Sequence, residues 1–159
     1  MKEFENRVAI VTGTTGIGRA IAKRLASSSC SVVACGIEAS ANQELQLEAQ
    51  ANGLTLLVEQ CDVSQPDQVR SVVAMTVAMH GRLDIIVNAA AIHPFGTAVD
   101  TDPDTWNRCM AVNLGSIFLL AHFGIPEMKK HDGGSILNLS SVQGHACQRM
   151  LHQKARSIA

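Results

Sequence analysis

The 159-residue chain contains no tyrosine, and aromatic residues make up only 3% of it. No active site within this sequence can therefore use a phenol to donate or accept a proton, one of the roles of side chains in general acid–base catalysis. The six histidines show no ligand-like spacing with one another or with the cysteines. A zinc site, which needs such clustered ligands, is therefore not expected.

Excess charge and long apolar runs are also absent. The net charge is −1, which gives no bulk basicity to attract nucleic acid or an anionic membrane. No uninterrupted run of about 18 apolar residues suggests a membrane span. The first residues, MKEFENRVAI, lack the basic-then-apolar order of a signal peptide. We expect a cytoplasmic globular protein with neither a nucleic-acid nor a membrane partner.

The cysteines show no C-x-x-C pairing and have mostly apolar neighbours. This pattern favours buried free thiols in a reducing cytosol over disulfides or metal ligands. The five are Cys30, Cys35, Cys61, Cys109 and Cys147.

Short apolar runs alternate with stretches of helical periodicity, as in repeated βαβ units. The expected strands cover residues 8–11, 31–35, 54–58, 83–87 and 135–139. This order predicts an α/β fold of Rossmann type: a right-handed, doubly wound parallel sheet of about five strands, incomplete at its C-terminal side. We assign residues 1–147 to this dinucleotide-binding domain. Residues 148–159 have no matching apolar period, and we expect an aberrant, disordered tail there.

The expected helices have recognisable boundaries. Ser64 is predicted to cap a helix that continues through Pro66 and Asp67 and ends at Gly81. Another helix is predicted to start within residues 101–104. Apolar residues at helical spacing are expected to face the core; in the first helix they are Ile17, Ala20, Ile21 and Leu25, and in the last Trp106, Met110, Leu114, Ile117 and Leu120.

A glycine-rich turn lies between the first expected strand and its helix. Glycines allow the backbone there to turn tightly and approach a pyrophosphate, which the amides at the helix N-terminus then bind. The turn lacks the Gly-Lys-Ser/Thr ending of a P-loop. Its candidate cofactor-binding residues are Gly13, Thr14, Thr15, Gly16, Ile17 and Gly18.

With this turn and four further motifs in order, the sequence resembles the short-chain dehydrogenase/reductase family. Its glycine turn is one residue shorter than the family usually has. Asp62-Val63 is similar to the family's pair whose carboxylate contacts the adenine amino group. Residues 88–91 stand where the family has Asn-Asn-Ala-Gly, and the resemblance makes Asn88, Ala89 and Ala90 candidate cofactor contacts.

Two candidate catalytic residues follow from the same resemblance. Asn113 matches the asparagine that interrupts a helix and holds a water in the family's proton relay. Ser141 matches the serine that hydrogen-bonds the substrate carbonyl. The resemblance implies an oxidoreductase that moves hydride between NAD or NADP and an alcohol or carbonyl substrate, and relatives that often form homo-oligomers.

The choice between NAD and NADP stays open. It is normally decided at the end of the second strand, where an acid accepts the ribose 2′-hydroxyl or an arginine meets a 2′-phosphate. Gly36 stands at the acid's position and offers neither signal. Glu38 could reach the ribose or be solvated, and Arg19 could serve the cofactor or lie on a helix surface.

The resemblance also implies a tyrosine that passes a proton to or from the substrate oxygen, and a lysine four residues later that lowers the pKa of that tyrosine. Neither has a counterpart in this sequence. Counting from Ser141, they would fall at Lys154 and Ile158. We therefore expect an inactive chain, truncated relative to the family and frameshifted after about residue 149. With suitable codons for residues 149–155, the next reading frame encodes Tyr-Val-Ala-Ser-Lys, the family's signature. The alternative is a non-catalytic NAD(P)-binding or regulatory protein that kept the fold.

Overall fold

The computed structural model describes residues 3–141 of the chain. Five parallel strands form one sheet in the order β3-β2-β1-β4-β5. Their bounds are β1 Val8–Thr12, β2 Ser31–Gly36, β3 Leu56–Gln60, β4 Ile85–Asn88 and β5 Ser135–Asn138. The strand order reverses between β1 and β4, so the carboxyl ends of these two strands open a crevice where such sheets bind ligands. The predicted doubly wound parallel sheet is confirmed.

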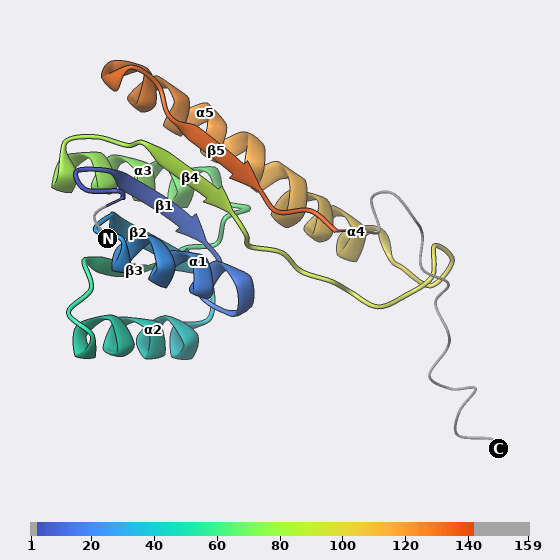
Figure 1. The fold of residues 1–159 in the computed structure, drawn as a ribbon. Helices are drawn as coiled ribbons and strands as arrows, with labels where there is room; N and C mark the ends of the chain where they lie inside the picture. The colour runs from blue at the N-terminus through green and yellow to red at the C-terminus, as the bar shows by residue number, and fades with distance from the viewer. Residues whose placement is uncertain (1–2, 142–159) are drawn as a thin grey trace.

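Helices cover both faces of the sheet (Figure 1). They are α1 Gly16–Ser27, α2 Ala39–Ala51, α3 Pro66–His80, α4 Pro103–Met110 and α5 Ser116–Met128. A π-helical segment, η1 (Ala111–Gly115), joins α4 to α5, and a short 3₁₀ turn, η2 (Lys129–His131), follows α5. Side chains alternate across each strand, which divides the core into two layers. On β1, Ile10 packs on the side of α3 and α5, whereas Ala9 and Val11 pack on the side of α1 and α2.

The start of α3 differs from the sequence prediction. Gln65 is the N-cap residue and makes no side-chain cap, while Pro66 occupies the first turn as expected. The Ser64 hydroxyl instead hydrogen-bonds the Asp62 carboxylate at 2.8 Å. The prediction that Ser64 caps this helix was therefore wrong, because the charged carboxylate of Asp62, two residues earlier, binds the Ser64 hydroxyl. The predicted end is confirmed, since Gly81 adopts φ +77° there.

Some residues predicted to face the core are exposed. In α1, Ile17 is 66% exposed, and the small residues Gly18, Ala22 and Ala26 are buried instead. The last helical stretch departs further: Trp106, Met110 and Leu114 are exposed and only Leu120 is fully buried. Figure 1 gives the reason, since α4 extends beyond the carboxyl ends of the strands while α5 lies beside the sheet. The sequence showed an apolar face but not where the sheet ends.

The four cysteines within residues 3–141 are free, as predicted. Cys30, Cys35 and Cys61 are buried and Cys109 is half-buried. Burial, together with the nearby charge of Asp84, raises the pKa of the Cys30 thiol to about 11. That thiol is therefore protonated at neutral pH and a poor nucleophile. Cys147 lies outside the described residues.

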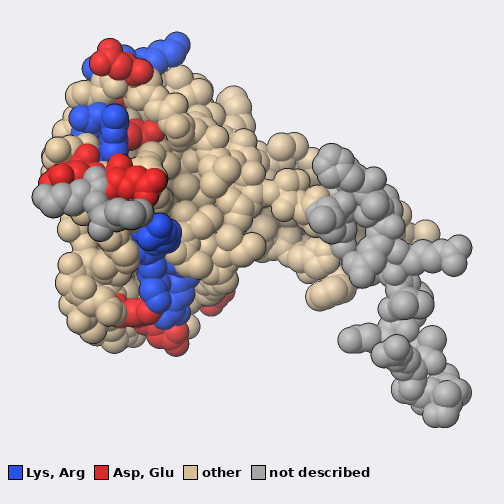
Figure 2. All heavy atoms as spheres, viewed as in Figure 1, with Lys and Arg blue, Asp and Glu red and all other residues tan. Residues whose placement is uncertain are grey.

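Within the helical stretch Pro103–His131, an 18-residue window has a mean hydropathy of 1.6, and 22% of that window is buried. By length and composition it is one candidate membrane span, which the search for uninterrupted apolar runs missed. Core helices of soluble proteins also pass this test, and α5 buries one face here through Leu120, Gly124 and Met128. Figure 2 shows Lys and Arg atoms interspersed with Asp and Glu atoms on one face of the molecule, with no extended basic area.

Candidate functional site

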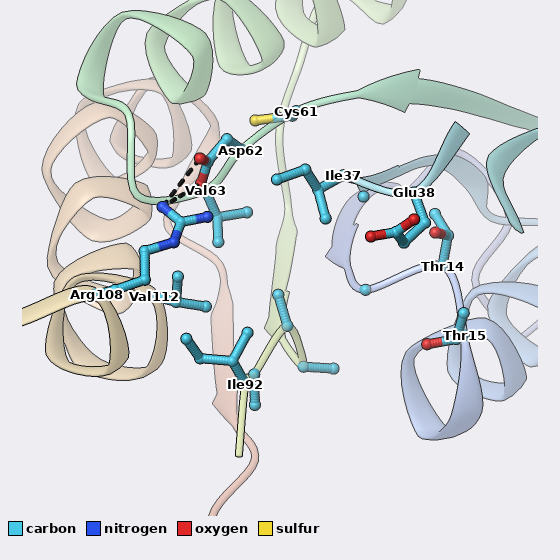
Figure 3. A pocket seen from close by; sticks show the side chains of 15 residues that line it. Thr14, Thr15, Ile37, Glu38, Cys61, Asp62, Val63, Ile92, Arg108 and Val112 are labelled. Atoms are coloured by element: carbon cyan, nitrogen blue, oxygen red, sulfur yellow. Dashed lines mark hydrogen bonds and ion pairs between the residues drawn. The ribbon is translucent and has the colours of Figure 1, made fainter. Parts of the chain in front are cut away.

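A pocket of about 290 Å³ lies at the carboxyl ends of the strands (Figure 3). Its lining comes from the glycine turn, the ends of β2, β3 and β4, and the helix that follows. The lining residues are Gly13, Thr14, Thr15, Gly36, Ile37, Glu38, Cys61, Asp62, Val63, Ala89, Ala90, Ala91, Ile92, Arg108 and Val112. The structure therefore brings most of the predicted cofactor contacts into one crevice, at the reversal of strand order where dinucleotides bind.

The three glycines of the turn meet different demands. Gly13 has φ +89°, and a Cβ there would lie 3.2 Å from the backbone of Ala89. Gly16 has φ +50° with open space around it. A Cβ on Gly18 would lie 2.2 Å from the carbonyl oxygen of Gly13. Glycine is therefore required for backbone conformation at two of these positions and for close packing of α1 against β1 at the third.

Thr12, at the end of β1, fixes the turn against the loop after β4. Its hydroxyl accepts hydrogen bonds from the backbone N–H groups of Ala89 and Ala90, both at 3.0 Å. The small side chains after Asn88 leave this backbone open to the pocket. Thr12 was not among the sequence candidates, although a buried polar residue at a strand end adjoining the glycine turn is a usable signal.

Thr14 and Asn42 form a second buried link. The Thr14 hydroxyl donates to Asn42 Oδ1 at 2.6 Å, and Asn42 Nδ2 donates to the carbonyl oxygen of Gly36 at 2.9 Å. This chain of hydrogen bonds ties the glycine turn to the end of β2 and to α2. Sequence reasoning missed Asn42, because nothing local shows that a polar residue in a surface helix is buried here.

Asp62 lies at the opposite side of the pocket, paired with Arg108 of α4 (Figure 3). The guanidinium is 2.9 Å from the carboxylate, which also accepts the Ser64 hydroxyl. Burial would raise the pKa of Asp62, but these bonds from Ser64 and Arg108 outweigh it and lower the pKa. Asp62 is therefore ionised at neutral pH. Its neighbour Val63 is buried and lines the same pocket.

Arg108 was missed by sequence reasoning. It carries the one formal positive charge among the residues that line this pocket. Its place opposite Asp62 depends on how α4 crosses the crevice, which no local pattern encodes.

Asn88 is the last residue of β4, and only the nitrogen of its side-chain amide is hydrogen-bonded. Its Nδ2 donates to Asn138 Oδ1 at 2.7 Å, whereas its own Oδ1 is buried and has no partner among the described residues. A buried acceptor without a donor costs free energy. A ligand that brings a hydroxyl or amide donor to this point would remove that cost.

Asn113 lies in the π-helical segment η1, so the predicted helix interruption is present. Its Oδ1 accepts the N–H of Ile92 and its Nδ2 donates to the Ile92 carbonyl, both at 2.8 Å. The amide thus holds the loop after β4 from the side of the helix. The water-binding role implied by the resemblance stays a prediction.

Ser141 follows the end of β5 and is exposed. It is not among the residues that line the pocket. Its predicted contact with a substrate oxygen stays a prediction. The positions predicted for the tyrosine and lysine, Lys154 and Ile158, lie outside the described residues, as does the predicted tail.

A glycine turn that leaves backbone exposed at one side of the pocket and an ionised acid at the other suit a dinucleotide. The crevice has the form of a nucleotide site in a doubly wound α/β protein. The family model for short chain dehydrogenase matches residues 7–152. The chain belongs to the short-chain dehydrogenase/reductase family.

Among curated relatives, the chain is 38% identical over 143 residues to dehydrogenase/reductase SDR family member 4 of Sus scrofa, covering 89% of this chain and 51% of that protein. It is 34% identical over 139 residues to the Homo sapiens protein of the same name, covering 86% and 50%. The chain thus spans about half the length of these relatives.

Solved structures give the same result. A short-chain dehydrogenase/reductase from Burkholderia xenovorans superposes with a TM-score of 0.85 and 31% identity, covering 91% of this chain and 60% of that one. A metagenomic short-chain oxidoreductase in complex with NADP has a TM-score of 0.83 and 34% identity, covering 89% and 65%. The family and fold predictions are confirmed.

Proposed function

We propose that this chain forms the cofactor-binding part of an NAD(P)-dependent oxidoreductase acting on an alcohol or carbonyl compound. The observation that supports this most is the pocket at the reversal of strand order, where the glycine turn faces the backbone after Asn88. Family membership and the NADP bound by one similar structure support the cofactor class. A small-molecule substrate, a cytoplasmic location and homo-oligomer formation belong to the same proposal.

Each residue has a role in this proposal. The glycine turn and the first amides of α1, from Gly16 to Gly18, bind the pyrophosphate. Asp62 and Val63 hold the adenine, and Asn88, Ala89 and Ala90 contact the middle of the dinucleotide. Asn113 fixes the loop beneath it, and Ser141 orients the substrate oxygen. When bound, the nicotinamide cofactor supplies or accepts hydride.

We further propose that the chain itself does not turn over substrate. It contains no tyrosine, so the phenol that the family resemblance implies for proton transfer is missing. Lys154 stands at its position and would need its pKa lowered far below about 10.4 to replace it. This feature favours, as the second candidate, a nucleotide-binding protein without catalysis.

The gene distinguishes these two candidates. A frameshift near codon 149 leaves Tyr-Val-Ala-Ser-Lys codons in another frame close by. A DNA sequence with no such codons in any frame would contradict the frameshift and favour the non-catalytic protein.

The binding site itself is tested with calorimetry of the purified chain against NAD⁺ and NADP⁺. We expect one of them to bind, and Gly18→Ala to weaken binding at least tenfold, because its Cβ would meet the Gly13 carbonyl oxygen at 2.2 Å. Gly53→Ala is the matched control: it strains the backbone, because Gly53 has φ +63°, but its Cβ meets no neighbour and it lies away from the pocket. No binding by the folded chain, or equal losses in both variants, would refute the site.

A further inference from the structure

The end of β2 cannot carry an acidic side chain at position 36. A Cβ on Gly36 would lie 2.3 Å from Thr14 Oγ1 and 3.0 Å from Asn42 Oδ1. Thr14 is held in that space by its hydrogen bond to Asn42. The Thr14 side chain thus fills the volume into which a side chain at position 36 would point, so an acid of this segment that contacts the ribose must lie further along it.

Glu38 is the first acid beyond this point. It lines the pocket and is exposed, at the N-cap position of α2. Figure 3 shows its carboxylate on the side of the pocket formed by the glycine turn, away from Asp62 and Arg108. Its side chain forms no cap to α2 and no hydrogen bond or ion pair with any other residue of the described range 3–141. Its acceptor oxygens are therefore available to a ligand.

Two cations of α1, Arg19 and Lys23, are already paired with acids of α2. Arg19, in the first turn of α1, binds Glu48 at 2.8 Å and Glu44 at 3.2 Å, both on α2. Lys23 is also paired with Glu48. Arg108 does line the pocket, but it binds Asp62, and Figure 3 shows this pair well apart from Glu38.

These observations determine which ribose substituent the pocket can accept. A carboxylate accepts hydrogen bonds from the 2′- and 3′-hydroxyls of a ribose, whereas a 2′-phosphate would bring like charge beside it. No unpaired cation among the described lining residues compensates that charge. We propose that the site selects NAD over NADP and that Glu38 is the residue that determines the choice. This inference rests on the proposed nucleotide-binding function.

The experiment measures dissociation constants of NAD⁺ and NADP⁺ for the 159-residue chain by calorimetry. Adenosine 5′-monophosphate and adenosine 2′,5′-bisphosphate provide a second pair that reports on the adenosine end alone. We expect the ligand without the 2′-phosphate to bind at least tenfold more tightly in both pairs. In Glu38→Gln the ratio of the two dissociation constants in each pair falls toward one. In Glu38→Arg the preference reverses, so that the 2′-phosphorylated ligand binds more tightly.

Glu127→Gln is the control, because it removes the same charge on α5, where Glu127 pairs with Lys130 outside the pocket. Its ratio should match that of the unaltered chain. Equal or tighter binding of the 2′-phosphorylated ligand by the unaltered chain, or an unchanged ratio in Glu38→Gln, overturns the inference while nucleotide binding stands. If neither dinucleotide binds, both the inference and the proposed function fail.

Discussion

At the scale of single residues, Asp84 carries a dense set of charge-assisted hydrogen bonds at the opposite end of the strands from the pocket. Its side chain is 3% exposed. It accepts hydrogen bonds from Arg82 at 2.6 and 2.8 Å, from Arg7 at 2.8 Å and from the N–H of Val8 at 2.9 Å. Burial would raise the pKa of Asp84, but these donors outweigh it and lower the pKa to about 2. The carboxylate thereby joins the starts of β1 and β4.

This depressed pKa makes the free energy of unfolding depend on pH. A carboxyl whose folded pKa lies below its unfolded value stabilises the fold above the unfolded pKa, near 4. That contribution, about 2 kcal/mol, is lost as the pH falls toward 2. Asp84→Asn should therefore reduce the free energy of unfolding by at least this amount at pH 7, with a difference that shrinks below pH 4.

Urea denaturation of both proteins across this pH range measures the difference. Asp104→Asn, an exposed acid in α4, serves as control and should show little change. A deficit in Asp84→Asn that stays constant from pH 7 to pH 2 would mean that the carboxylate charge is not the cause.

At the scale of elements, α4 depends on its own cap more than on the core. None of its residues is buried. The Asp102 side chain accepts the Thr105 N–H at 2.9 Å and the Thr105 hydroxyl at 2.7 Å. The hydrogen bond from the Thr105 N–H lowers the pKa of Asp102 most, and the bond from the Thr105 hydroxyl lowers it further. The carboxylate is thus ionised at the positive end of the helix dipole, where it stabilises the first turn.

Loss of this cap should loosen α4 without unfolding the sheet. In Asp102→Ala we expect faster amide hydrogen exchange at Thr105 and Trp106, because the first-turn N–H loses its acceptor. Exchange in β1 and β4 should not change. Asp104→Ala, which removes an acid from the same turn without removing the cap, is the matched control. Equal exchange at Thr105 in the two variants would show that the cap does not hold this helix.

At the scale of the whole molecule, β5 is one edge of the described sheet. Leu137 on this strand is 53% exposed. An apolar edge strand presents unpaired backbone groups and invites pairing with another chain. The chain should therefore self-associate as its concentration rises.

Leu137→Lys should reduce this association, because a charge on an edge strand opposes pairing with a second copy. Sedimentation velocity over a range of concentrations measures the change. Gln43→Lys places the same charge on an exposed position of α2, away from β5, and should leave association as it is. A monomeric unaltered chain at all concentrations would contradict the prediction.

Much of this organisation could be predicted from sequence. Continuous apolar runs such as that of β1 identified strands buried on both faces, and Gly81 marked the end of α3. The glycine turn and the Asp62-Val63 pair were recognisable because their constraints are local: backbone conformation and position after a strand. Strand and helix order then fixed the doubly wound class, since parallel crossovers are right-handed.

Only the tertiary structure decided which side chains meet. Asn42 lies in α2, Glu38 is the N-cap of the same helix, and Arg108 lies in α4. Their distances to the glycine turn depend on how α2 and α4 cross the strand ends. The exposure of Trp106 likewise depends on where the sheet stops. Periodicity gives a helix its apolar face, but burial requires a partner surface, and that surface is built by residues distant in sequence.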